Sequence, residues 1–322
     1  MNSQIELDNI IEVINKAKKI GIFTHVNPDG DAIGSSMALY LSLKQLNKEV
    51  DIIADEYSRC FNFLSNLEEI KKEGSKDYDL AIALDCATKG RLFDPNNSFD
   101  NSITSVSIDH HASNTFFANF NYVEGKSPAA CKTLVKVLKR LNVSLNKEIG
   151  ECLMAGIITD SGGFRYDTVD DETFEFAAQM LDLGVNISDI YYRTFDIKTK
   201  AQFKLSAIAT ERLKFYCNEK VALTYLTKGD FVKAKASAGD HEGIVNIGRN
   251  IEGVEVSIFL REDLDDIYKV SLRSNNYVNV SEIAEVFDGG GHEKAAGLTI
   301  EDKLDVAIKK LVKETKKRLW MV

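Results

Sequence analysis

The sequence predicts a two-domain α/β protein, in which a larger domain with a parallel sheet and helices on both faces is joined by a helical linker to a smaller, mixed α/β domain. Three observations support this fold class. With 322 residues, the chain is longer than one hydrophobic core usually serves. Residues 1–183 alternate short apolar runs with helical patterns, as buried parallel strands and their connecting helices do. The pattern then changes to a mostly polar helical stretch and a second set of strands.

The elements of the first domain follow from the period of the apolar residues. Apolar residues recur at helical spacing in five segments, and helices are predicted at 5–18, 32–46, 128–141, 148–159 and 171–183. Apolar runs too short for helices predict a strand that ends with 21–23 and further strands at 50–54, 79–85 and 105–111.

The second half of the chain begins with a mostly polar helical stretch at 188–213, which could bridge two domains. Beyond it, strands are predicted at 221–226, 255–260 and 268–274, followed by a glycine cluster at 289–292 and a last helix at 302–319. We therefore expect a first domain at 1–186, a helical linker at 187–213 and a second domain at 214–322.

Composition excludes several classes of protein. The net charge of −9 argues against a protein that coats long nucleic acid, because such proteins normally carry a basic surface. The five cysteines are scattered and form no CxxC pair, which is typical of thiols in a reducing compartment. No apolar run approaches the roughly 20 residues that span a bilayer, and the N-terminal residues lack a signal-peptide core. We expect a soluble, cytoplasmic protein with no membrane partner.

A histidine and two carboxylates lie in a Pro/Gly turn between the first strand and the next helix: His25, Asp29 and Asp31. Like charges two residues apart raise each other's pKa unless a counter-charge is present. A divalent metal is the usual counter-charge, and imidazole with carboxylate suits Mn, Zn or Fe. The alternative for the turn alone is a capped helix after a Pro-Asp-Gly turn.

Further acids and imidazoles follow the other predicted strands and one helix. The complete set is His25, Asp29, Asp31, Asp85, Asp109, His110, His111 and Asp160. Because ligands gather at the carboxyl ends of parallel strands, we expect these side chains to converge. Six or more N/O ligands exceed what one ion needs and suit two ions that share a bridging carboxylate. Two-metal sites are typical of phosphoester hydrolysis, in which a hydroxide that bridges the metals attacks the phosphorus.

The segments HVNPDGDAIGS, ALDC, DHH and ITDSGGF together resemble the DHH phosphoesterase superfamily. The segment GGGHEKAAG at 289–297 is similar to the signature of its companion C-terminal domain, DHHA1. The order, spacing and length of these motifs resemble the NrnA-type subfamily of bifunctional oligoribonucleases and 3′-phosphoadenosine 5′-phosphate phosphatases. This resemblance implies hydrolysis of short RNA or DNA oligonucleotides and nucleotides to mononucleotides, with no long nucleic acid as partner. It is also consistent with a homodimer.

The resemblance further implies a role for each residue. One metal would be held by His25, Asp29 and Asp85, and the other by Asp31, Asp85, His110 and Asp160. The catalytic residues would be His111, which faces the scissile phosphate, and Asp109, which orients an imidazole. Both metals would be Mn²⁺, although the residues alone also accept Fe or Co.

The second domain would bind the substrate through six residues: Arg273, Ser274, Gly289, Gly290, Gly291 and His292. The glycines allow close backbone approach and an anion-binding nest, His292 adds a donor, and arginine suits phosphate. A short nucleotide would then bridge the metals and this anchor in a cleft between the domains.

Three other functions compete with this hypothesis. The nearest is a phosphodiesterase specific for cyclic di-AMP or linear dinucleotides, which shares both domains. A DHH-type inorganic pyrophosphatase ranks lower because its C-terminal domain lacks the GGGH cluster. A non-catalytic nucleotide-binding sensor ranks lower because that hypothesis predicts a missing ligand, and none is missing here.

Overall fold

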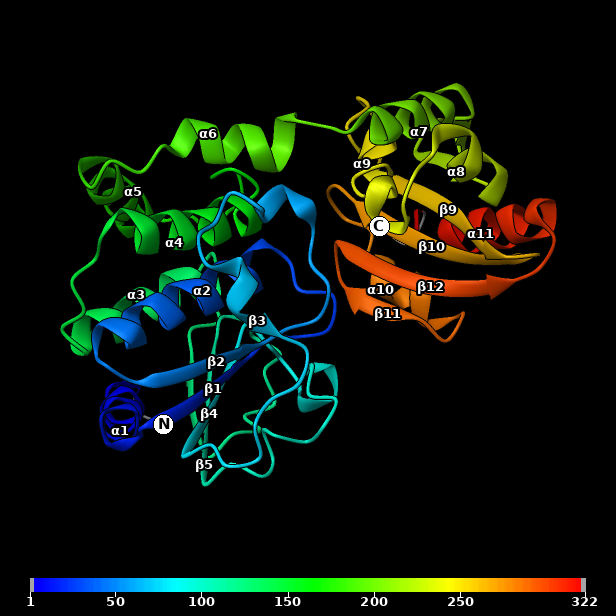
Figure 1. The fold of residues 1–322 in the computed structure, drawn as a ribbon. Helices are drawn as coiled ribbons and strands as arrows, with labels where there is room; N and C mark the ends of the chain where they lie inside the picture. The colour runs from blue at the N-terminus through cyan, green and yellow to red at the C-terminus, as the bar shows by residue number, and fades with distance from the viewer. Residues whose placement is uncertain (1–2, 320–322) are drawn as a thin grey trace. The chain divides into compact units, whose positions relative to one another are not determined.

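The computed structural model describes residues 3–319, which form two compact units that divide between Ile197 and Lys198 (Figure 1). Each unit is built on its own six-stranded sheet and has its own hydrophobic core.

The sheet of the first unit has the strand order β3-β2-β1-β4-β5-β6, and every neighbouring pair is parallel. Its strands are β1 (Lys19–Phe23), β2 (Glu49–Ile53), β3 (Ile70–Lys71), β4 (Leu80–Leu84), β5 (Thr104–Asp109) and β6 (Phe120–Val123). The four strands predicted from apolar runs are the four inner ones. The edge strands β3 and β6 were not predicted, because the first has two residues and the second includes a polar asparagine.

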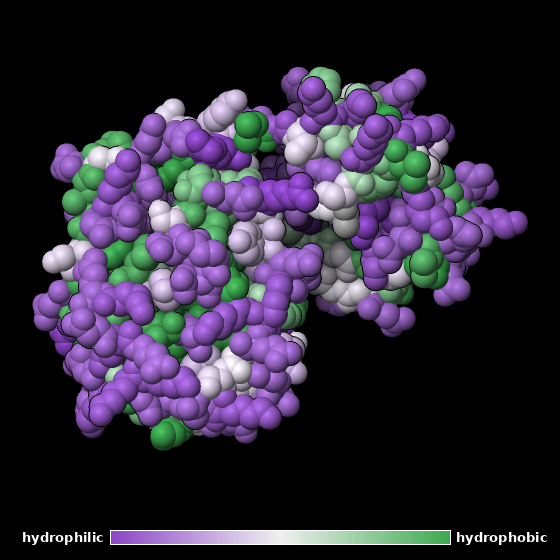
Figure 2. Space-filling view, viewed as in Figure 1, coloured by the Kyte–Doolittle hydropathy of each residue, from purple (hydrophilic) through white to green (hydrophobic). Residues whose placement is uncertain are grey.

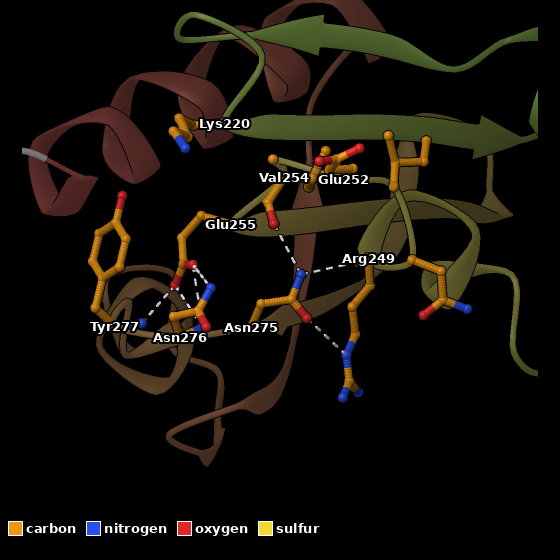
Figure 3. Close-up of a pocket in the computed structure, with 11 residues that line it drawn as sticks. Lys220, Arg249, Glu252, Val254, Glu255, Asn275, Asn276 and Tyr277 are labelled. Atoms are coloured by element: carbon orange, nitrogen blue, oxygen red, sulfur yellow. Dashed lines mark hydrogen bonds between the residues drawn. The ribbon is translucent and has the colours of Figure 1, made fainter.

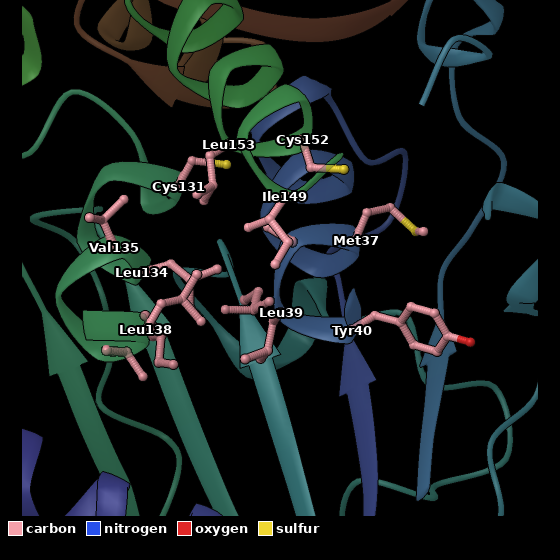
Figure 4. Packing of buried hydrophobic residues seen from close by; sticks show 14 of the residues in the cluster. Met37, Leu39, Tyr40, Cys131, Leu134, Val135, Leu138, Ile149, Cys152 and Leu153 are labelled. Atoms are coloured by element: carbon pink, nitrogen blue, oxygen red, sulfur yellow. The ribbon is translucent and has the colours of Figure 1, made fainter. Parts of the chain in front are cut away.

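The helices of the first unit are α1 (Ser3–Lys16), α2 (Gly30–Gln45), α3 (Ala130–Arg140), α4 (Lys147–Asp160), α5 (Asp171–Asp182) and α6 (Ile187–Tyr191). A short π-helix, η4 (Tyr192–Asp196), continues α6, and single 3₁₀ turns lie at η1 (Arg59–Phe61), η2 (Leu67–Glu69) and η3 (Lys89–Arg91). Buried side chains of α2, α3 and α4 pack against one another above the strands, as Figure 4 shows for Leu39, Leu138 and Leu153.

The two faces of this sheet are covered differently. Ile20 and Ile82 point to one face and join the core formed with α1 to α4. Phe23 and Ala83 point to the other face, where they pack with Phe99 and other residues of the segment 92–118. The α/β fold class is therefore confirmed, with one difference: loops and the 3₁₀ turn η3, rather than α-helices, cover the second face. The Asn- and Asp-rich connections after β4 and β5 lack the apolar period that a helix needs.

The sheet of the second unit has the order β11-β12-β10-β9-β8-β7, with β8 and β9 parallel and the other pairs antiparallel. Its strands are β7 (Lys214–Tyr216), β8 (Val221–Leu226), β9 (Val256–Leu264), β10 (Ile267–Ser274), β11 (Gly290–His292) and β12 (Ala295–Glu301). Its helices are α7 (Lys200–Glu211), α8 (Lys228–Ala234), α9 (Val245–Arg249), α10 (Val280–Glu285) and α11 (Leu304–Leu319), with a 3₁₀ turn η5 (Ala238–His241). This mixed α/β architecture confirms the second half of the predicted fold class.

The helical stretch expected at 188–213 is divided in the structure. Residues 197–199 separate η4 from α7, and the boundary between the units follows Ile197. The break has a local cause, because Thr199 adopts an extended conformation and caps α7 in a capping box with Gln202. Leu205 and Ala209 of α7 are buried in the core of the second unit, so α7 packs as part of that unit.

Among residues 3–319, no helix combines the length and apolar character that crossing a membrane requires. Figure 2 shows mainly hydrophilic residues on the face in view, with hydrophobic ones scattered among them.

Candidate metal centre

The register of the central strands brings three predicted residues into one row. Phe23 of β1 lies opposite Ala83 of β4, so two residues further along, His25 falls opposite Asp85. Leu84 lies opposite Ile108 of β5, which places Asp85 opposite Asp109. The backbone N–H of Asp85 donates to the carbonyl of Ile108 at 3.1 Å, so this pairing continues past the end of β4. The row lies at the carboxyl ends of the strands, as expected.

Two groups of ligand atoms meet at the carboxylate of Asp85. The Nε2 atom of His25 lies 4.0 Å from Oδ1 of Asp29 and 3.7 Å from Oδ2 of Asp85. On the other side, Nε2 of His110 lies 3.4 Å from Oδ1 of Asp85 and 3.3 Å from Oδ2 of Asp160. His110 is also 3.8 Å from Oδ2 of Asp31. All six predicted metal ligands are therefore brought together, with Asp85 between the two groups.

Helix ends position three of these acids. Asp29 is the N-cap of α2, and its Oδ1 accepts the N–H groups of Asp31 and Ala32 at 3.0 and 3.1 Å. Asp31 is fully buried and accepts the N–H of Cys131, at the start of α3, at 2.9 Å. Asp160 ends α4, where the negative end of the helix dipole disfavours a carboxylate. A cation beside Asp160 would offset that cost.

Backbone carbonyls determine which nitrogen each histidine presents. Nδ1 of His25 lies 2.9 Å from the carbonyl oxygen of Val26, and Nδ1 of His110 lies 3.1 Å from that of Ser127. Because a carbonyl can only accept, both Nδ1 atoms carry hydrogen when the rings are neutral. The lone pair of Nε2 then faces the carboxylates, as it does in histidines that bind metals.

The donor set fits divalent metal ions. Oδ1 of Asp85 is buried and has no hydrogen-bond partner among residues 3–319, although His110 Nε2 is 3.4 Å away. When His110 is neutral, two lone pairs face each other at that distance, and a cation that displaces the proton of Nε2 would satisfy both. Asp85 also has a φ of 53°, which is uncommon outside glycine and directs its carboxylate between the two histidines.

The electrostatics of the cluster show what a cation would replace. Burial raises the pKa of Asp31 to about 7 and that of Asp160 to about 8. Burial opposes protonation of His110, but Asp85 and the other nearby carboxylates outweigh it and raise the pKa of His110 to about 11. Asp85 itself remains ionised, because His110 and His25 overcome its burial and hold its pKa below the usual range. Without a cation, protons hold the cluster together, and a metal would displace them.

Asp109 and His111, the predicted catalytic residues, are linked directly. Nδ1 of His111 lies 2.8 Å from Oδ1 of the fully buried Asp109, which also accepts the backbone N–H of His110 at 2.8 Å. Oδ2 of Asp109 accepts an N–H from the side chain of Asn114 at 2.7 Å. With its oxygens occupied by donors, Asp109 is suited to orienting His111. Sequence reasoning missed Asn114, whose only signal was its position five residues after Asp109.

Glycines next to the cluster, which have no side chain, allow α2, α3 and α4 to approach closely. A Cβ atom added to Gly156 of α4 would lie 2.3 Å from Sγ of Cys131 and 2.6 Å from Oδ1 of Asp31. A Cβ atom on Gly30 of α2 would lie 2.4 Å from Oγ1 of Thr159. These glycines, which sequence reasoning did not select, permit the packing that places Asp31 in the cluster.

In the second unit, sheet register brings the predicted arginine and histidine to one face. Arg273 of β10 pairs with Ala295 of β12, and Ala295 pairs with His292 of β11. Directly paired residues share a face, so the side chains of Arg273 and His292 flank the small Ala295. Helices α10 and α11 pack on the opposite face, around Leu272 and Ala296.

The other predicted binding residues have different surroundings. Ser274 is buried, and its hydroxyl donates to the carbonyl of Val278 at 2.7 Å, so it stabilises the turn after β10. Gly290 and Gly291 form the edge strand β11 instead of the anion-binding nest suggested by the sequence, because pairing with β12 requires extended backbone. A Cβ atom on Gly289 would lie 2.4 Å from the carbonyl oxygen of Gly297, so the strand ladder itself requires that glycine.

Comparisons with known proteins agree with this arrangement. The DHH family, N-terminal domain, matches residues 19–157, and the DHHA1 domain matches residues 218–319. A bifunctional oligoribonuclease and PAP phosphatase NrnA from Thermus thermophilus is 32% identical over 304 residues, covering 93% of this chain and 90% of the relative. A protein of the same name from Bacillus subtilis is 24% identical over 295 residues, covering 90% and 92%.

A solved structure is also similar over nearly the whole chain. The crystal structure of an exopolyphosphatase-related protein from Bacteroides fragilis superimposes with a TM-score of 0.89 and 28% identity, covering 98% of this chain and 96% of that one. With both domains matched and the carboxylate–histidine cluster assembled, this chain belongs to the DHH family of phosphoesterases and carries a DHHA1 domain as its second unit.

Proposed function

We propose that this protein is a cytoplasmic hydrolase that uses two Mn²⁺ ions to cleave short oligonucleotides to mononucleotides and 3′-phosphoadenosine 5′-phosphate to AMP. The observation that carries the proposal is the Asp85 carboxylate, which has one oxygen toward His25 and the other toward His110. A carboxylate in that position can bridge two ions, as two-metal phosphoesterases require. The names of the NrnA relatives support the substrate class, and the five free cysteines support a reducing compartment.

The two groups of residues around Asp85 are the proposed ligand sets. His25, Asp29 and Asp85 would hold one ion, and Asp31, Asp85, His110 and Asp160 the other. Bound divalent ions supply Lewis acidity and lower the pKa of water enough for attack near neutral pH.

The oxygen and imidazole donors support manganese over a thiolate-bound metal. Two cysteines lie near the cluster, Cys86 and Cys131, and burial raises the pKa of both thiols. Both therefore remain protonated at neutral pH and are poor metal ligands. The remaining carboxylates and imidazoles suit Mn²⁺.

His111 is the proposed proton donor to the leaving oxygen. Its Nδ1 is held by Asp109, and the side chain is 27% exposed, so Nε2 can reach a substrate. The hydrogen bond to Asp109 raises the pKa of His111, which favours the protonated form that a general acid needs. Asp109 and Asn114 act through His111 as positioning residues.

The row of Arg273, Ala295 and His292 is the proposed anchor for the anionic end of the substrate. Arginine and histidine flank a small side chain there, which leaves room for a phosphate between two donors. Ser274 and the three glycines would serve this anchor by supporting the strands around it. A local anchor of this kind explains how a protein with a net charge of −9 could bind a nucleotide.

A product assay tests the proposal. The purified protein is incubated with Mn²⁺ and, separately, with pApA, 3′-phosphoadenosine 5′-phosphate and an RNA about ten times longer than pApA, and released AMP is quantified by chromatography. We expect AMP from the first two and little from the long RNA. Asp85→Asn should abolish release, whereas the exposed Asp305→Asn should retain it. No AMP from a wild-type protein that retains its metal would refute the proposed substrates.

A further inference from the structure

The second unit contains a cavity of about 480 Å³ between the end of α9, the start of β9 and the turn after β10. Figure 3 shows Arg249 and Asn275 on one side of the drawn residues and Lys220 and Tyr277 on the other. The volume lies within the range of small-molecule sites, roughly 300–1,000 Å³. Neither Arg273 nor His292 lines this cavity, so it is separate from the proposed anchor.

A buried carboxylate shapes the floor of the cavity. Glu255 is 2% exposed and accepts the backbone N–H groups of Asn276, Tyr277 and Val278, at distances of 2.7 to 3.1 Å. The side-chain amide of Asn276 donates to it as well. These donors satisfy Glu255, so its charge is compensated locally and the turn after β10 is rigidly held.

Arg249 is held in place by Asn275 and has no acidic partner among the described residues. Its Nε donates to Oδ1 of Asn275 at 3.3 Å, and the amide of Asn275 donates to the carbonyls of Arg249 and Val254. Among residues 3–319, no carboxylate forms an ion pair with either Arg249 or Lys220. An arginine with a fixed Nε and two uncommitted terminal nitrogens is prepared to bind an anion bidentately.

The cavity adjoins the face that carries the anchor. Arg273 pairs with Ser257 and Ser274 pairs with Val256, and the N–H of Asn275 continues this register by donating to the carbonyl of Glu255 at 3.0 Å. Asn275 is therefore on the same face as Arg273, about 7 Å further along the strand direction. A ligand that reaches Arg273 can extend into the cavity.

We propose that this cavity binds a nucleoside monophosphate unit, with its phosphate on the guanidinium of Arg249 and its base stacked on the ring of Tyr277. Tyr277 is 41% exposed and offers an open aromatic face. This inference rests on the proposed function, because the nucleotide substrate identifies the anion as a phosphate. It adds Arg249 to Arg273 as a residue that contacts the anionic end of the substrate and so distinguishes substrates with a 5′-phosphate from those with a 5′-hydroxyl.

Binding measurements on the full chain test the site without turnover. The titrations are done in EDTA, which removes metal ions so that phosphate cannot bind at the metal centre. Isothermal titration then compares the affinities of the protein for 5′-AMP, adenosine and inorganic phosphate. Arg249→Ala should weaken 5′-AMP by at least about tenfold, the usual effect of losing a charged hydrogen bond, and leave adenosine unchanged. Tyr277→Ala should weaken both 5′-AMP and adenosine. Lys228→Ala, which removes an exposed lysine paired with Asp265, is the matched control and should change neither.

Steady-state kinetics with pApA and ApA separate the inference from the proposed function. Arg249→Ala should raise the KM for pApA and leave that for ApA unchanged, with Arg249→Lys intermediate because lysine keeps the charge and loses the fork. Equal KM changes for the two substrates, or unchanged affinity for 5′-AMP in Arg249→Ala, would overturn the inference. If the wild type hydrolyses neither substrate, the proposed function fails and the titrations still decide the site. If Arg249→Ala is misfolded by circular dichroism, Arg249→Lys and Tyr277→Ala decide it in the same titrations.

Discussion

Replacing Gly156 by alanine should disturb the proposed metal centre through the packing of α4 against Asp31, without replacing any of the proposed ligands. The new Cβ would lie 2.3 Å from Sγ of Cys131 and 2.6 Å from Oδ1 of Asp31. Non-bonded heavy atoms prefer about 3.5–4.0 Å, so α4 must move away or Asp31 must shift by about an ångström. Overpacking of this kind typically costs about 1–3 kcal/mol.

Helix propensity opposes that cost. Alanine is more favourable than glycine inside a helix by about 0.8–1.0 kcal/mol. The net change in the free energy of unfolding should therefore be a loss of about 0–2 kcal/mol, the difference of these two ranges. The effect on metal binding should be larger, because displacement of groups that orient ligands typically weakens affinity by about 10–100-fold.

Gly229→Ala is the matched control for this substitution. Gly229 lies in the first turn of α8, and a Cβ there would have no neighbour closer than 3.6 Å. This variant should be as stable as the wild type or slightly more stable, with unchanged Mn²⁺ affinity. Chemical denaturation gives the stability of each variant and isothermal titration gives its affinity for Mn²⁺. If Gly156→Ala binds Mn²⁺ as tightly as Gly229→Ala does, the packing behind Asp31 does not position that ligand.

Three further predictions concern the acids and the anchor. Asp109→Asn should lower kcat by about 10²–10⁴-fold. It should also move the alkaline limb of the pH profile to lower pH, because the pKa of His111 falls without the Asp109 carboxylate. Unchanged kcat at full metal content would argue against a positioning role for Asp109. Mn²⁺ should raise the Tm more at pH 8 than at pH 6. Burial raises the pKa of Asp31 to about 7 and that of Asp160 to about 8, above their unfolded value of 3.8, so the stability of the metal-free protein falls as pH rises from about 4 to about 8. At pH 8 the two carboxylates are largely ionised and the metal binds them without displacing protons, whereas at pH 6 it must displace those protons. A smaller shift at pH 8, in melting curves with and without Mn²⁺, would contradict this. Arg273→Ala should raise KM far more than it changes the metal content measured by atomic emission, and a collapse in metal content would contradict a separate anchor.

The fold could be predicted where the apolar pattern was continuous. The inner strands and the helices α1 to α5 were located within a few residues, because burial on a sheet or along a helix face imposes a period on the sequence. The pattern failed where burial was slight or mixed. The strand β3 is too short to show a period, and the loops over the second face of the sheet contribute single aromatic residues such as Phe99 without any period.

The carboxylate–histidine cluster proposed to bind metal was predictable for a different reason. Acids and histidines that follow buried strands are costly unless a cation holds them, so their presence in such turns is informative without any structure. The role of Asn114 was not predictable in this way. An asparagine in a polar loop is common and need not have a functional role, and only its 2.7 Å hydrogen bond to Asp109 distinguishes Asn114.

By itself, the sequence determined the α/β class, the set of candidate metal ligands and the resemblance to a phosphoesterase family, because these depend on residue type and local spacing. Only the tertiary structure decided which residues face one another. Strand register placed Asp85 between His25 and His110, and the register of the second sheet placed Arg273 and His292 on either side of Ala295. The turn after β10 fixed Arg249 through Asn275, which no local pattern records. Register and packing are set by contacts between residues far apart in the chain, so no single segment of the sequence contains them.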